Sequence, residues 1–125
     1  MTPDEAITRE ADSIRSSIAR SPREFAKLFD WEFAFMGLAD QMKLRAWGDP
    51  LRRKELETRV TEETEEATSA WAIWNTYHRD DAALTGNERN LARGYDRRVQ
   101  EYVERTADDA LMEHGVEGLR IGGAL

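Results

Sequence analysis

Three residue pairs mark where helices begin in this chain. Each of its three prolines directly follows a good helix-capping residue, in the pairs Thr2-Pro3, Ser21-Pro22 and Asp49-Pro50. The oxygen of such a capping side chain accepts a hydrogen bond from a free N–H group of the first turn. Proline suits the first helical position because its missing N–H would have no partner there. These pairs therefore predict three helix starts.

A second signal strengthens two of these starts and adds a fourth. A glutamate stands three residues after the cap at Thr2, at Ser21 and also at Thr85. This spacing is the capping box, in which the glutamate reaches back to the N–H group of the capping residue. With apolar residues recurring at helical spacing, the sequence predicts helices over about 3–20, 22–47, 50–79 and 87–114.

The predicted helices differ in how much apolar surface they carry. The first has a narrow apolar seam, whereas apolar side chains cover more than half of the circumference of the second, which predicts a central position for it. Gly115 is placed to cap the last helix in a left-handed conformation. We expect an all-α fold, a four-helix bundle over residues 1–115 followed by an extended C-terminal arm over residues 116–125.

Composition excludes several classes of protein. The formal net charge of -7 argues against a protein that coats nucleic acid, since phosphates are held mainly by Lys and Arg. The absence of cysteine removes disulfides, thiolate catalysis and Cys-type zinc sites. The first residues do not resemble a secretory signal, and no apolar run approaches membrane-spanning length, so we expect a soluble protein.

Signals of enzymatic chemistry are essentially absent. No P-loop, dinucleotide fingerprint or serine-elbow pattern occurs. A di-metal helical bundle needs Glu-x-x-His motifs, but Asn75 and Leu111 stand three residues before His78 and His114. We therefore expect no enzyme, no cofactor and no metal. An unrecognised catalytic site around Glu32, Glu63 and His78 is the weakest alternative.

Glu32 is unusual because it lies within the apolar arc of the second predicted helix. A carboxylate there must be paired, be protonated or face a polar interface, since an unpaired buried charge is costly. An internal salt bridge and an ion pair between subunits both satisfy this requirement, and the sequence leaves both open.

Basic residues gather at the predicted turn between the second and third helices. Lys43, Arg45, Arg52, Arg53 and Lys54 surround Asp49, which gives this turn a formal charge of about +4. Such a tip can contact phosphate or an acidic protein surface. An ordinary solvated turn with basic residues near helix ends explains the same pattern at least as well.

The last ten residues form an apolar strip interrupted by glycine. Fully extended, they would span roughly 33 Å. Their candidate anchors for a partner are Val116, Leu119, Arg120, Ile121 and Leu125. Because apolar side chains alternate with Arg120, the strip suits addition to the strand edge of another chain. Packing on its own bundle is the simpler alternative.

A helical bundle of this length followed by an extended arm, Val116 to Leu125, resembles the head-to-tail adaptor proteins of tailed viruses. The resemblance lies in the overall layout and implies a ring of subunits beneath the portal, with the arm docked on the portal. It would also place the protein in the virion, with the basic tip facing DNA or the neighbouring ring.

The functional expectation is a non-enzymatic structural protein, a helical subunit of a homo-oligomer or larger assembly that also contacts a neighbouring assembly protein. The alternative is a small regulatory or nucleic-acid-associated protein that uses the basic tip around Arg52 and resides in the cytoplasm.

Overall fold

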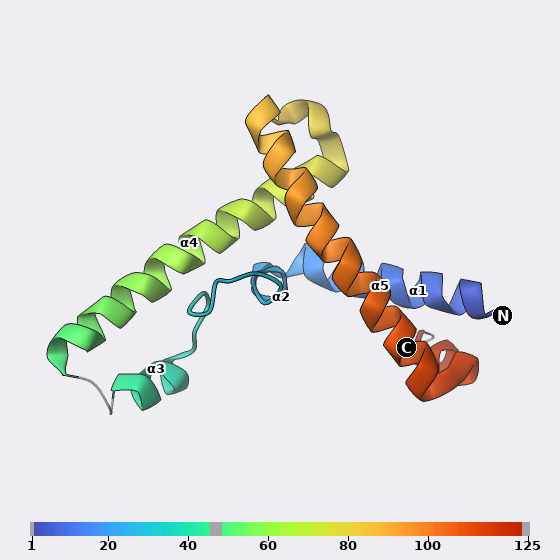
Figure 1. Cartoon of the computed structure of the whole chain (residues 1–125), viewed down its shortest axis with the longest axis horizontal. Coiled ribbons are helices and arrows are strands. Elements are labelled where there is room, and N and C mark those ends of the chain that lie inside the picture. The colour runs from blue at the N-terminus through green and yellow to red at the C-terminus, as the bar shows by residue number, and fades with distance from the viewer. Residues whose placement is uncertain (1, 46–48, 124–125) are drawn as a thin grey trace.

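All secondary structure in the described part of the chain is helical. The computed structural model describes the backbone of residues 2–45 and 49–123, and the side chains of these residues as far as residue 115 (Figure 1). The elements are α1 (Pro3–Arg20), α2 (Pro22–Ala26), α3 (Leu38–Arg45), α4 (Pro50–Asp80), the 3-10 turn η1 (Asp81–Ala83) and α5 (Gly86–Gly123). The predicted all-α class is confirmed.

The predicted helix starts are present, with their caps. Thr2 and Glu5 form a complete capping box at the start of α1. Thr85 and Glu88 bond reciprocally before α5, with N···O distances of 2.9 and 3.2 Å. Asp49 accepts from the N–H of Arg52 at 2.9 Å and so caps α4.

The capping box predicted at Ser21 is only half formed. The hydroxyl of Ser21 accepts from the N–H of Glu24 at 3.3 Å. The carboxylate of Glu24, however, pairs with the ammonium of Lys27 at 3.1 Å. The N–H of Ser21 donates instead to the backbone carbonyl of Ile18 at 3.2 Å.

The prediction of one long helix over residues 22–47 is wrong. The chain leaves α2 after Ala26, runs through turns and resumes a helix only at Leu38. Phe35 has φ 58°, a left-handed conformation that a continuous right-handed helix excludes. The N–H groups of Phe33 and Phe35 bond instead to Glu63 and Thr64 of α4. Side-chain acceptors on α4 therefore replace two of the helical hydrogen bonds that this segment gives up.

The hydrophobic core lies where four segments meet: the end of α1, α2 with the turn after it, the second half of α4, and the middle of α5. Its buried members are Ile18, Phe25, Leu28, Ala70, Trp74, Val99 and Val103. Figure 1 shows α4 and α5 diverging from the turn that joins them, with α1 crossing α5. The aligned four-helix bundle is thus not confirmed, because helix ends project from a central junction.

Aromatic rings fill the middle of this junction. Phe25 is fully buried, with its ring centroid 5.6 Å from that of Trp74 and 4.8 Å from that of Phe29. Tyr95 meets Phe25 edge-on at 5.8 Å. Burial raises the pKa of the Tyr95 phenol above its ordinary value of 10.0.

The prediction of an extended arm is wrong for the backbone of residues 116–123. Gly115 does adopt the positive φ expected of a helix-ending glycine, at 70° with ψ 177°. The chain then resumes a helical course to Gly123, so the glycine redirects the helix. Eight helical residues span about 12 Å, roughly half of what the same residues would reach if extended.

Truncating Phe25 should test the junction. We expect Phe25→Ala to lower the free energy of unfolding by about 3–5 kcal/mol, because it removes a fully buried ring contacted by other aromatic side chains. Urea unfolding followed by circular dichroism measures this. The control Leu51→Ala removes a side chain that is 73% exposed and should change stability by less than about 0.5 kcal/mol. Equal effects of both substitutions would contradict this location of the core.

Candidate functional site

The segment between α2 and α3 is fastened to α4 by polar contacts. One carboxylate oxygen of Glu63 accepts from the N–H of Phe33 at 2.7 Å, and the hydroxyl of Thr64 accepts from the N–H of Phe35 at 2.9 Å. The indole N–H of Trp31 donates to Glu66 at 3.3 Å. Part of the acidic run in α4 therefore serves as acceptors for this segment.

Arg59 adds a cation–π contact to the same region. Its guanidinium carbon lies 4.2 Å from the centre of the Phe33 ring, and its Nη2 lies 3.7 Å from Glu63. Since Glu63 also holds the backbone of Phe33, the arginine, the glutamate and the ring position one another. The Glu63 side chain is only 16% exposed, so water screens these contacts weakly.

Arg45 links helix α3 to the start of α4. The guanidinium of Arg45 pairs with Glu57 of α4 and also donates to Gln41 at 3.3 Å. Gln41 in turn donates to the backbone carbonyl of Met36 at 2.9 Å. These contacts join the end of the 27–37 segment, α3 and the start of α4. We call this region the tip, and it lies at one extreme of the molecule (Figure 1).

A groove of about 320 Å³ lies between α3 and α4 at this tip. Phe33, Leu44 and Leu56 contribute apolar surface to it. Its charged lining residues are Arg45, Arg52, Arg53, Glu55 and Arg59. A surface with apolar contact area among arginines suits a partner that presents carboxylates beside an apolar side chain. We call it the arginine groove.

The structure separates the five predicted basic residues into two groups. Arg45 is engaged in holding α3 to α4 and has only 28% of its side chain exposed. Arg52, Arg53 and Lys54 are exposed on the first turns of α4. Lys43 is 79% exposed and lies 4.0 Å from Asp40. Arg45 therefore has a structural role, and the other four are accessible to a partner.

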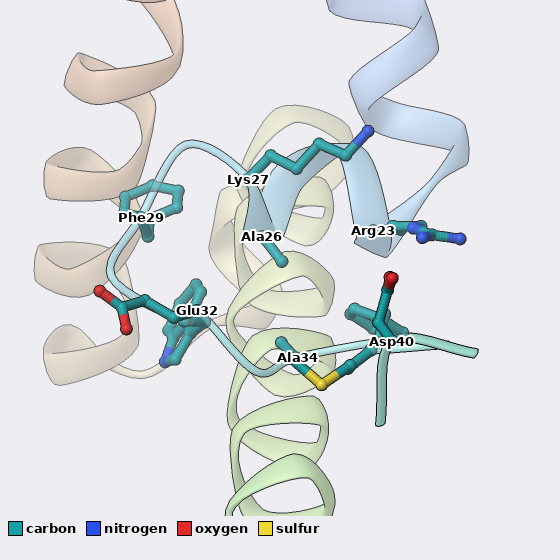
Figure 2. A pocket seen from close by; sticks show the side chains of 10 residues that line it. Arg23, Ala26, Lys27, Phe29, Glu32, Ala34 and Asp40 are labelled. Carbon is teal, nitrogen blue, oxygen red and sulfur yellow. The ribbon is translucent and has the colours of Figure 1, made fainter. Parts of the chain in front are cut away.

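Glu32 does not occupy the buried position that the sequence suggested. It is exposed, because the continuous helix that would have buried it is replaced by the 27–37 segment. It lines a second, open hollow of about 370 Å³ beside α2. In Figure 2, Phe29 and Glu32 lie on one side of this hollow, and Arg23 and Asp40 lie on the other. This hollow carries charges of both signs.

The residues of the weakest catalytic alternative do not converge. Glu63 and His78 are fifteen positions apart on the same helix, which corresponds to about 22 Å. Glu63 is engaged with Phe33, and the Nε2 of His78 lies 2.7 Å from Asp96 of α5. Among the described side chains of residues 2–45 and 49–115, no group of His, Cys, Asp or Glu has the arrangement of a metal site.

The five predicted arm residues are described only in part. The backbone of Val116, Leu119, Arg120 and Ile121 lies in the final helical segment, and their side chains lie outside what the structure describes. Leu125 lies outside the described residues altogether. Among helices of the described chain, no stretch is long and apolar enough to cross a membrane.

Sequence reasoning missed Phe33, Glu57 and Arg59 as parts of this site. The spacing of Arg59 and Glu63 at i and i+4 signalled an ion pair on one helix face. Nothing in the sequence indicated that Phe33 would join that pair.

Comparison of this chain with protein-family models, with curated proteins and with solved structures finds no match.

Removing the carboxylate of Glu63 should loosen the 27–37 segment. We expect Glu63→Ala to leave the N–H of Phe33 without its acceptor and to cost about 1–2 kcal/mol, which should speed hydrogen exchange at that amide roughly 5- to 30-fold. Exchange followed by NMR measures it. The matched control Glu62→Ala changes an exposed neighbour and should leave the Phe33 amide unaffected. Equal protection in both variants would contradict the role of Glu63.

Proposed function

We propose that this protein is a non-enzymatic subunit of a protein assembly, in which copies of the chain contact one another and a neighbouring assembly protein. The observation that carries the proposal is the placement of large apolar side chains on the projecting ends. Leu38, Met42 and Leu51 are 68%, 60% and 73% exposed at the tip, and Met112 is 86% exposed on the distal part of α5. Apolar residues gathered at a projecting tip are typical of surfaces that a partner covers.

The narrower form of the proposal is a connector adaptor in the virion of a tailed virus. It divides the chain into a bundle of four main helices over residues 1–115 and a C-terminal arm over residues 116–125. Val116, Leu119, Arg120, Ile121 and Leu125 would anchor the arm on the neighbouring protein. Gly115 supports this division, since the change of direction at its positive φ separates the last segment from the rest of α5. Glu32, which is exposed, is available for an ion pair between subunits.

Light scattering across a concentration series tests the assembly role. We expect the full-length chain to have a solution mass that is a multiple of 14.4 kDa and rises with concentration. A chain that ends after Gly115 should form the same species, because the proposal anchors the arm on a neighbouring protein rather than on another copy. Circular dichroism of both chains verifies that truncation leaves the fold intact. Monomers of both chains at every concentration would contradict the proposal.

Binding of nucleic acid at the tip is the second candidate function. The observation that favours it is the exposure of Arg52, Arg53 and Lys54 beside one another. If the tip binds nucleic acid, the affinity of the full-length chain for a DNA duplex should fall steeply as salt is added. Changing these three residues to Glu should then abolish binding. The assembly proposal predicts no measurable duplex binding at physiological salt. Fluorescence anisotropy of a labelled duplex distinguishes the two.

A further inference from the structure

The tip and the opposite end of the molecule carry opposite charge. Residues 43–54 contain five basic side chains and one aspartate. The basic ones that face solvent are Lys43, Arg52, Arg53 and Lys54. Two of them, Arg52 and Arg53, line the arginine groove beside Leu44 and Leu56. This surface is the positive end of a chain whose formal net charge is -7.

The first half of α1 and the distal part of α5 form an acidic end. Residues 4–12 and 101–113 contain nine acidic side chains and two arginines. All of the acidic ones except the half-buried Glu10 are exposed: Asp4, Glu5, Asp12, Glu101, Glu104, Asp108, Asp109 and Glu113. Figure 1 shows the N-terminus and the distal part of α5 on the side of the molecule opposite α3 and the start of α4.

Apolar side chains accompany the charges at both ends. Met112 is 86% exposed and follows Asp108 and Asp109 by about one helical turn, so these three side chains share one face of α5. At the other end, the arginine groove joins apolar surface to arginines. The two surfaces are complementary in charge, and each offers apolar contact area to the other.

One copy of the chain cannot bring its own two ends together. Arg52 lies 22 positions before Trp74 on α4, which places the tip about 33 Å along a rigid helix from the core. The acidic end lies on the side of the molecule opposite the tip (Figure 1). A contact between these two surfaces therefore requires a second copy.

We propose that the arginine groove of one copy binds the acidic end of a second copy, with Met112 in the groove and Asp108 and Asp109 on Arg52 and Arg53. This inference rests on the proposed assembly function and names its contact. Because the two surfaces differ, the contact is heterologous, and each bound copy still offers one free end. Repetition of such a contact produces a closed ring or an open filament.

The contact should weaken as salt is added, because charges exposed to solvent are screened over about 10 Å at 0.1 M salt. The apolar contribution of Met112 is not screened and should persist. Electrostatic complementarity mainly selects the partner and speeds the encounter, which makes reversal of charge the appropriate test.

Charge reversal at each end, followed by mixing, tests the contact. The tip variant carries Arg52→Glu and Arg53→Glu, and the acidic-end variant carries Asp108→Lys and Asp109→Lys. Each variant alone presents like charges at both ends of the contact, so its self-association should fall at least about tenfold. An equimolar mixture restores opposite charges at every contact and should assemble again in alternating order. Light scattering measures all three samples, and circular dichroism establishes that both variants fold.

Matched controls carry the same charge changes at other exposed positions. Arg93→Glu with Arg97→Glu lies on α5, and Asp80→Lys with Asp81→Lys lies at the turn between α4 and α5. Both controls should assemble like the natural chain. If they lose assembly as the end variants do, net charge rather than the proposed contact is responsible, and the inference is overturned.

The remaining outcomes separate this inference from the proposed function. A natural chain that stays monomeric rejects the assembly function and the contact together. A natural chain that assembles, with end variants that assemble equally well, rejects only the contact. Loss of assembly in both variants without rescue on mixing also overturns it. If the tip variant then also loses binding of a DNA duplex, phosphate is the ligand of the tip.

Discussion

The structure depends on the aromatic junction around Phe25 and Trp74. Both rings are almost completely buried, and they are contributed by segments that are distant in sequence. The indole N–H of Trp74 has a hydrogen-bond partner at this junction, since it donates to Asp96 at 3.1 Å. Buried aromatic surface and a paired N–H group together hold α4 against α5. Without this junction the helices would share no common core.

Side-chain donors fix the chain where helices end at this junction. Trp71 donates to the carbonyl of Ile18 at 3.0 Å, and Asn75 donates to that of Ala19 at 3.1 Å. Arg98 donates to the carbonyl of Leu28 at 2.9 Å. These carbonyls lie near the ends of α1 and α2, where the helix no longer provides N–H donors for its last carbonyl groups. The same core that buries the rings thereby determines how α1 turns into α2, and the projecting ends extend from that arrangement.

Capping chemistry predicted the helices that begin at Pro3 and Pro50, because it depends only on residues within one turn. The break after Ala26 could not be predicted in this way. Apolar periodicity shows that the aromatic residues of 27–37 seek burial, but it does not show that Glu63 and Thr64 will accept from their backbone. Those partners are about 30 positions away in sequence, and only the tertiary structure brings them close.

The candidate site, like the fold, was predictable from the sequence only in part. The cluster of basic residues at the turn was visible in the sequence, and Arg52 and Arg53 do line one groove. The structural role of Arg45 was not visible, since its partner Glu57 lies on another helix. Gly115 was recognised as a left-handed position, but a backbone that turns at glycine can continue as helix or as strand. The sequence alone does not decide between them.

In the proposed assembly, two unlike ends of this chain meet between copies. Cross-linking tests it directly, because the natural chain contains no cysteine and an introduced thiol is unique. Leu51→Cys at the tip, Met112→Cys at the acidic end and Ser69→Cys elsewhere on α4 each place one thiol at an exposed position. With a short thiol cross-linker, a mixture of the Leu51→Cys and Met112→Cys chains should give far more dimer than either chain alone or any mixture with Ser69→Cys. Equal cross-linking in all samples would show that the two ends do not meet.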